Sequence, residues 1–218
     1  MQLVCPAGNF PSLKAAVDNG ANDVYLGLAD TTNARHFAGL NFTSKNLSKA
    51  IDYAHANGTR VLLAVNTYPR AKDRTTWTTA IDVAADNGVD AVILADIGLL
   101  EYATTKWPDM PRHLSVQGSA TSATSLAFYK RHFDIQRAVL PRVLDLYQVE
   151  ALIKETDIEI EIFGFGSLCI MVEGRCLLSS YLTGESPNTH GACSPAKFVR
   201  WEQSNNQLEC RLNGHLLD

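Results

Sequence analysis

Apolar and polar positions follow two periods that alternate along most of the chain. Short apolar runs such as Val61–Val65 and Ala91–Ala95 have the length of strands buried on both faces. Between such runs, Ala, Leu and Ile recur at helical spacing. The pattern predicts seven strands, near residues 2–5, 23–28, 60–66, 91–96, 113–117, 138–141 and 158–164. It predicts helices over Pro11–Asn19, Ser44–Asn57, Asp73–Asn87, Ile97–Lys106, Ala120–Arg131 and Asp145–Glu155.

An Asn-Gly step precedes three of these strands, at residues 17–20, 56–58 and 85–88. Gly favours the left-handed conformation that ends a helix, so each step marks a helix end followed by a buried strand. Strict β/α alternation indicates parallel strands joined by right-handed crossovers. This leaves two architectures, a (β/α)8 barrel and an open doubly wound sheet.

Two observations favour a TIM-like barrel. No Gly-rich dinucleotide fingerprint follows the first strand, and polar residues recur just past the strand ends, which converge on one face of a barrel. Those residues are Cys5, Asn9, Asn33, Arg35, Asn66, Tyr68, Asp96, Gln117, Arg142 and Glu161.

We expect residues 1–165 to form the β/α units and residues 166–218 to form Cys-rich loops and a β-hairpin packed on the same domain. The hairpin is predicted from Lys197–Glu202 and Leu208–Leu212, which flank a polar turn. No eighth strand follows the seventh, so we expect an incomplete barrel in a chain truncated relative to a full one.

Three cysteines gather after the seventh predicted strand, in a Gly-rich stretch. Six residues separate Cys169 from Cys176, and sixteen separate Cys176 from Cys193. Neither gap is the short knuckle of a zinc finger, and thiolates presented by separate loops suit an iron–sulfur cluster. Any one of the three could instead be a buried, inert thiol. Cys5 and Cys210 are interpreted as structural.

Composition narrows the class of protein. The 218 residues are 46% hydrophobic, enough for one sizeable core. A net charge of −4 gives no basic field for nucleic acid, so no nucleic-acid partner is expected. No apolar run approaches the ~20 residues of a membrane helix, and no signal segment precedes Leu3, so we expect a cytoplasmic protein. Five cysteines in a reducing compartment argue against disulfides.

A longer motif extends over the cysteines: Glu161-x-Phe163-x2-Gly166-Ser167-x-Cys169-x6-Cys176-x2-Ser179. It resembles the collagenase-like peptidase family of unknown catalytic type. Four further stretches are similar to the branch of that family that acts in ubiquinone biosynthesis, and the resemblance covers the whole chain. These stretches are Cys5–Asn9, Asn33–Phe42, Gly166–Met171 and Tyr181–Asn188.

The resemblance implies an oxygen-independent hydroxylation of a ubiquinone-precursor ring. It implies a UbiV-like sister subunit and a lipid-carrier partner, with prephenate or a similar molecule as the candidate oxygen donor. It also implies that Cys169, Cys176 and Cys193 are three of the four ligands of a [4Fe–4S] cluster, the fourth being a cysteine beyond residue 218.

Catalytic candidates are weaker. Arg35 and His36 follow the second strand, where a guanidinium could bind a carboxylate-bearing donor; loop packing is the alternative. Glu161 could donate a proton or orient a ligand, or could pair with a neighbouring Arg. For four further residues we favour, or weigh equally, structural roles: Asp96, Gln117, Arg142 and His190.

Two other functions stay open. A collagenase-like peptidase could use Cys169 as its nucleophile, although one thiolate suffices for that chemistry. A non-catalytic module stapled by zinc could dock a catalytic partner, with His190 as a possible nitrogen ligand near Cys193.

Overall fold

Seven parallel strands alternate with helices and curl into an open barrel. The computed structural model describes residues 1–166, 169, 176, 180–181, 184–191, 200–204, 207–212 and 215–217. The strands of this sheet are β1 Val4–Pro6, β2 Asp23–Gly27, β3 Arg60–Val65, β4 Ala91–Leu94, β5 Arg112–Leu114, β6 Arg137–Val139 and β7 Glu159–Glu161. The helices between them are α1 Phe10–Asp18, α2 Ser44–Ala56, α3 Thr75–Asp86, α4 Ile97–Lys106, α5 Ala123–Phe133 and α6 Leu146–Glu155.

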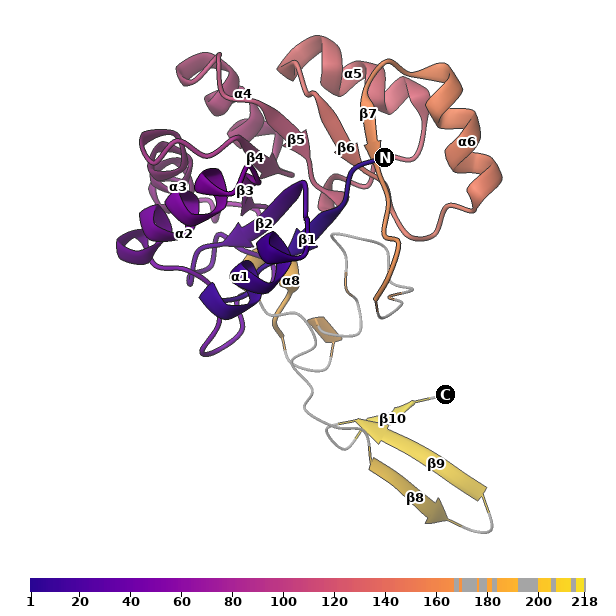
Figure 1. Ribbon diagram of the computed structural model, residues 1–218. Helices are drawn as coiled ribbons and strands as arrows, with labels where there is room; N and C mark the ends of the chain where they lie inside the picture. The colour runs from indigo at the N-terminus through magenta and orange to yellow at the C-terminus, as the bar shows by residue number, and fades with distance from the viewer. Residues whose placement is uncertain are drawn as a thin grey trace.

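The strand order follows the sequence, β1-β2-β3-β4-β5-β6-β7, and every neighbouring pair is parallel. The helices lie on the outer side of the curled sheet (Figure 1). Among the strands described, β1 and β7 form the two edges. The predicted TIM-like fold with seven strands is therefore confirmed.

The main core lies between the sheet and its helices. Fully buried side chains such as Leu13, Leu47, Trp77 and Leu99 come from successive helices and pack on the outer face of the strands. At about 25 cal/mol per Å² of apolar area, this layer is the chief source of stability. A second, smaller cluster lies inside the barrel, built from Leu62, Ala64, Ala91 and Ile93 with Val4 and Tyr25 packed against it.

The predicted helix ends are also confirmed. Gly20, Gly58 and Gly88 each adopt positive φ, at 85°, 73° and 71°, one residue beyond the Asn that caps the helix. Among the barrel units, the polypeptide after β5 departs from the prediction: it forms a short 3-10 helix, Val116–Gly118, where the sequence suggested continued strand.

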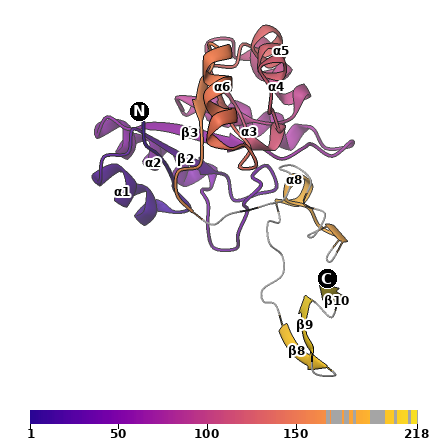
Figure 2. The ribbon, with the colours of Figure 1, turned by 90° about the vertical axis from the view of Figure 1, so that its right-hand side faces the viewer.

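A further helix and a small sheet are described after the barrel units. A four-residue helix, α8 Pro187–His190, lies beside the loops at one end of the sheet (Figure 2). Three antiparallel strands then form a separate sheet: β8 Arg200–Ser204, β9 Gln207–Leu212 and β10 His215–Leu217. The β8–β9 pair is the predicted hairpin, and β10 was not predicted. No helix in the described part of the chain is long and apolar enough to cross a membrane.

Candidate active site at the open end of the barrel

Alternate residues of each strand point into the barrel, because successive side chains of a strand face opposite sides of the sheet. On β5 these are His113 and, beyond the strand, Ser115; on β6 they are Arg137 and Val139. The interior therefore has two ends, one where the strands begin and one where they finish. The two ends differ in chemistry.

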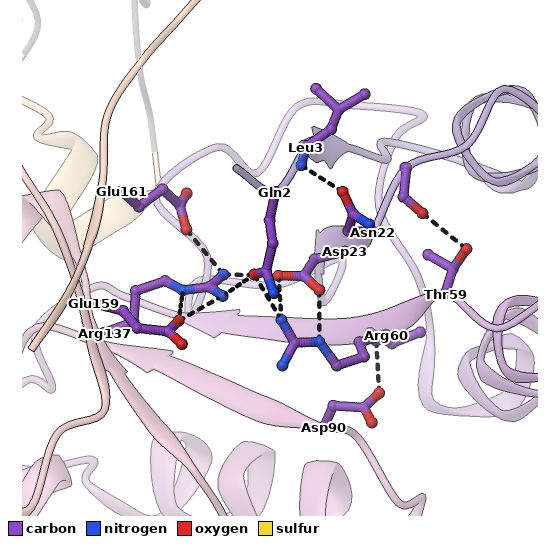
Figure 3. A network of polar contacts seen from close by, with 12 residues as sticks. Gln2, Leu3, Asn22, Asp23, Thr59, Arg60, Asp90, Arg137, Glu159 and Glu161 are labelled. Atoms are coloured by element: carbon purple, nitrogen blue, oxygen red, sulfur yellow. Dashed lines mark hydrogen bonds and ion pairs between the residues drawn. The ribbon is translucent and has the colours of Figure 1, made fainter.

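Paired charges close the end where the strands begin. The carboxylate of Asp23, fully buried, accepts hydrogen bonds from Arg137 Nη1 at 2.7 Å and from Arg60 Nε at 2.7 Å. Arg137 also donates to Gln2 at 2.7 Å and to Glu159 at 2.9 Å (Figure 3). Burial alone would raise the pKa of Asp23, but the two guanidinium groups hold it below its ordinary value.

The other end opens into a cavity of about 220 Å³ at the carboxyl ends of the strands. This is the end at which TIM-like barrels carry their sites. Most of the wall is apolar, and a few polar groups converge on it. The polar side chains in the wall are Tyr25, Asn33, Arg35, Asn41, Asn66, Ser115 and Glu161. The apolar ones include Leu26, Phe37, Leu40, Ile93, Val116, Val139 and Phe163.

The loop that carries Arg35 is fixed by asparagines. Asn33 accepts the Arg35 backbone N–H at 3.0 Å and donates to Asn41 at 3.0 Å. Asn66, at the end of β3, accepts the Ala34 N–H at 3.0 Å. Gly27 makes room for Asn33, since a Cβ at Gly27 would lie 2.1 Å from Asn33 Nδ2. Arg35 is thus presented to the cavity by a constrained turn.

Glu161 links the two ends of the interior. Its carboxylate lies 3.5 Å from Arg137 Nη1, and its side chain also lines the cavity. Burial raises the pKa of Glu161 above its ordinary value, although the positive charge of Arg137 opposes the shift. Glu161 therefore pairs with a neighbouring Arg and also lies in the cavity wall, while its catalytic role stays a prediction.

Tyr25 faces the same space. Burial raises the pKa of its hydroxyl, an effect that the charges of Arg35 and Arg142 oppose and that Glu161 adds to. Arg35, Arg142 and Glu161 therefore all lie within electrostatic reach of the Tyr25 hydroxyl. Within the described residues, no hydrogen bond engages the Tyr25 hydroxyl, which leaves it able to meet a ligand.

The segment that leads to Cys193 packs against the cavity loops. Gly191 accepts the backbone N–H of His36 at 3.1 Å, and Asn188 accepts that of Tyr68 at 2.6 Å. Cys169 and Cys176 are partly buried and not in disulfides. Cys193 lies outside the described residues, so the predicted three-cysteine ligand set is not tested here. The described part of the chain contains no group of three metal-binding side chains.

Comparison with known proteins identifies the family. The model of peptidase family U32 matches residues 8–215. The chain belongs to peptidase family U32. Two relatives support this assignment. The chain is 34% identical over 202 residues to tRNA hydroxylation protein P of Escherichia coli. It is 35% identical over 210 residues to an uncharacterized protease of Methanocaldococcus jannaschii. These matches cover 92% and 94% of this chain but 43% and 50% of the relatives.

The chain thus spans about half the length of the curated relatives that it matches. Among solved structures, that of the U32 peptidase Mk0906 superposes with a TM-score of 0.61 at 15% identity. It covers 74% of this chain and 68% of the other, and supports the fold alone. The predicted resemblance to the collagenase-like peptidase family is confirmed at the level of the family, which includes proteins named for RNA hydroxylation.

The structure places the other sequence candidates of this U32 chain outside the cavity wall or in its backbone framework. Asp96 caps α4 by accepting the Leu99 N–H at 3.0 Å. Gln117 lies in the 3-10 helix, and its backbone carbonyl accepts the Tyr68 hydroxyl at 3.0 Å. Arg142 lies over the Phe163 ring at 4.4 Å, at the edge of the cavity. Cys5 packs against the core. For His190 only the backbone is described.

Sequence reasoning did not single out several residues of the U32 cavity wall, among them Tyr25, Asn41, Ser115 and Phe163. Tyr25 carried a signal, because it and Asp23 are polar side chains at alternate positions of β2, whose intervening residues are apolar. Asn41 has φ of 76°, which its sequence neighbourhood did not predict. His36 is near the site through its backbone bond to Gly191, but it does not line the cavity.

Proposed function

We propose that this chain is the iron–sulfur subunit of an oxygen-independent hydroxylase of the UbiU type, which acts in the cytoplasm on the ring of a ubiquinone precursor. A UbiV-like sister subunit and a lipid-carrier partner are part of this proposal. So is a carboxylate-bearing oxygen donor of the prephenate kind. The hydroxylation names carried by family members support the reaction class.

The observation that carries the proposal is the cavity itself. A space of about 150 Å³ accommodates benzene, so about 220 Å³ suits one substituted aromatic ring. Phe37, Leu40 and Phe163 provide apolar contacts to such a ring, whereas Arg35 provides a fork of donors for a carboxylate. The net charge of −4 disfavours an RNA substrate, since RNA binding depends on phosphate contacts.

The donor set fits an iron–sulfur group. Thiolates are the preferred ligands of such clusters, and Cys169 and Cys176 are both partly buried and not in disulfides. With Cys193 they would hold the cluster, and the resemblance predicts a fourth ligand outside residues 1–218. Bound there, a [4Fe–4S] cluster supplies redox or Lewis-acid chemistry.

The described residues have separate tasks in this proposal. Arg35 binds and orients the carboxylate of the donor, because its backbone is held by Asn33 and Asn66. Glu161, with its raised pKa, keeps a proton at higher pH than an exposed glutamate does and can deliver it to oxygen at the ring. Tyr25 can donate a hydrogen bond beside it. The apolar wall excludes water.

The test is anaerobic production of hydroxylated quinone precursor, measured by mass spectrometry in cells that hold the sister subunit. Expression of this chain should yield product, and Cys176→Ala and Arg35→Met should abolish it. Cys5→Ala is the matched control, since Cys5 packs in the core and should keep activity. Hydroxylated RNA in place of hydroxylated quinone would show that the substrate is RNA. Hydrolysis of gelatin by metal-free protein would indicate a peptidase.

A further inference from the structure

The loop that presents Arg35 is in contact with a segment more than 150 residues later in the sequence. Gly191, which ends α8, accepts the backbone N–H of His36 at 3.1 Å. A Cβ at Gly191 would lie 2.5 Å from the Asn33 carbonyl oxygen and 3.0 Å from His36 Cβ. Backbone atoms cannot move aside as a flexible side-chain end can. The two segments therefore meet at a distance that only glycine permits.

Asn33 lies between two such glycines. Gly27 on β2 approaches its side chain, and Gly191 approaches its carbonyl. Asn33 in turn accepts the Arg35 N–H. A second contact holds the same segment: Asn188 accepts the Tyr68 N–H at 2.6 Å, and the Asn188 side chain is 4% exposed. The α8 segment is thus attached to the loops that follow both β2 and β3.

We infer that Gly191 is a positioning residue for the cavity: it holds the Arg35 loop against the α8 segment. The position of α8 is thereby coupled to carboxylate binding by Arg35. The role of the cavity in this inference rests on the proposed function, whereas the contact between Gly191 and the Arg35 loop does not. Positioning of this kind matters because a misplacement of about 1 Å can cost on the order of 100-fold in rate.

The chain supplies a matched control. Gly184 has φ of 70° and Gly191 has φ of 68°, so an Ala at either position carries the same left-handed backbone strain. At Gly184, however, a Cβ meets nothing within 4 Å. Comparison of Gly191→Ala with Gly184→Ala separates loss of the contact from strain.

The experiment measures two quantities on the purified chain: hydrogen exchange of the His36 amide, and binding of the aromatic carboxylate 4-hydroxybenzoate. We expect Gly191→Ala to speed hydrogen exchange of the His36 amide and to weaken the affinity for the probe by about 10-fold or more, since both depend on a positioned loop. Gly184→Ala should change each by less than about 3-fold. Equal effects of the two variants would overturn the inference.

Two further outcomes keep it testable. If Gly191→Ala does not fold, exchange in the wild-type chain decides: a saturating probe should slow both His36 and Tyr68 amides, and protection of neither would contradict the coupling. If the wild-type chain does not bind the probe, the carboxylate role of Arg35 and the proposed function are wrong. The His36 exchange comparison then still tests the positioning role, because it needs no ligand.

Discussion

The two ends of the barrel interior both carry arginine and carboxylate side chains, but they use them differently. Where the strands begin, Arg137 and Arg60 are fully engaged by Asp23, Gln2 and Glu159. Where they finish, Arg35 faces a cavity of about 220 Å³, and its own loop is fixed through backbone bonds rather than through its guanidinium. Charges that are paired within the protein stabilise it, whereas a charge positioned without such a partner can bind a ligand.

This difference separates the residues that stabilise the fold from those that can bind a ligand. Among the described residues, Glu161 contacts the closed end and also lines the cavity. Substitutions at the closed end should therefore change unfolding, substitutions at the open end should change binding, and Glu161 should change both modestly.

The largest expected effect is at the closed end. Asp23→Ala removes the acceptor of two guanidinium groups and leaves Arg137 buried without its partner, so it should lower the free energy of unfolding by about 3 to 5 kcal/mol. Urea denaturation measures it. Glu159→Ala is the control, because the Glu159 side chain is 62% exposed and its ion pair should contribute less than about 1 kcal/mol. Equal losses in the two variants would contradict the closed-end description.

The open end should respond in binding and not in stability. Arg35→Met removes the guanidinium from the cavity and should weaken the affinity for 4-hydroxybenzoate by about 100-fold. The free energy of unfolding should change by less than about 0.5 kcal/mol. Calorimetry gives the affinity and urea denaturation the stability. Arg70→Met, at an exposed position outside the cavity wall, should leave the affinity unchanged. If both variants bind alike, Arg35 is not the anion-binding group.

His113 lies in the interior between the two ends, 5% exposed, and burial lowers its pKa to about 3, with Arg137 adding to the shift. A histidine with a lowered pKa in the folded state takes up its proton more readily when unfolded. Its presence therefore costs stability as pH falls from about 6.5 toward 3. In His113→Leu, the loss of stability on going from pH 7 to pH 4 should shrink by about 3 kcal/mol. An unchanged pH dependence of the urea midpoint would show that His113 is not the titrating group.

Glu161 should change stability less than Asp23 does, and in a pH-dependent way. Because burial raises its pKa in the folded state, the stability that its protonated form contributes is present below the pKa of the unfolded chain and is lost as pH rises through the raised value. Glu161→Gln cannot ionise, so its stability relative to wild type should increase over that pH range, by less than the change in Asp23→Ala. A relative stability that falls with rising pH would mean that the pairing with Arg137 outweighs burial.

Much of the fold followed from the sequence because its signals are local. The buried runs of β3 and β4 and the Asn-Gly steps before β2, β3 and β4 each report on a few neighbouring residues. Glu161 and Arg35 were placed at the site for the same reason, as polar residues just at or beyond strand ends.

What could not be predicted depends on distant pairs. The bond between Arg137 and Asp23 joins residues 114 apart in the sequence, and nothing near either residue marks the other. The contact of Gly191 with Asn33 is of the same kind. The cysteine ligand set stays a prediction, because Cys193 lies outside the described residues.

Iron and acid-labile sulfide in anaerobically purified protein test the account most directly. In protein that includes the predicted fourth cysteine beyond residue 218, the account predicts about four of each per chain, lost in Cys176→Ala and kept in Cys5→Ala. Stoichiometric zinc, or full iron retained in Cys176→Ala, would contradict the claim that the open end of this barrel carries an iron–sulfur hydroxylase.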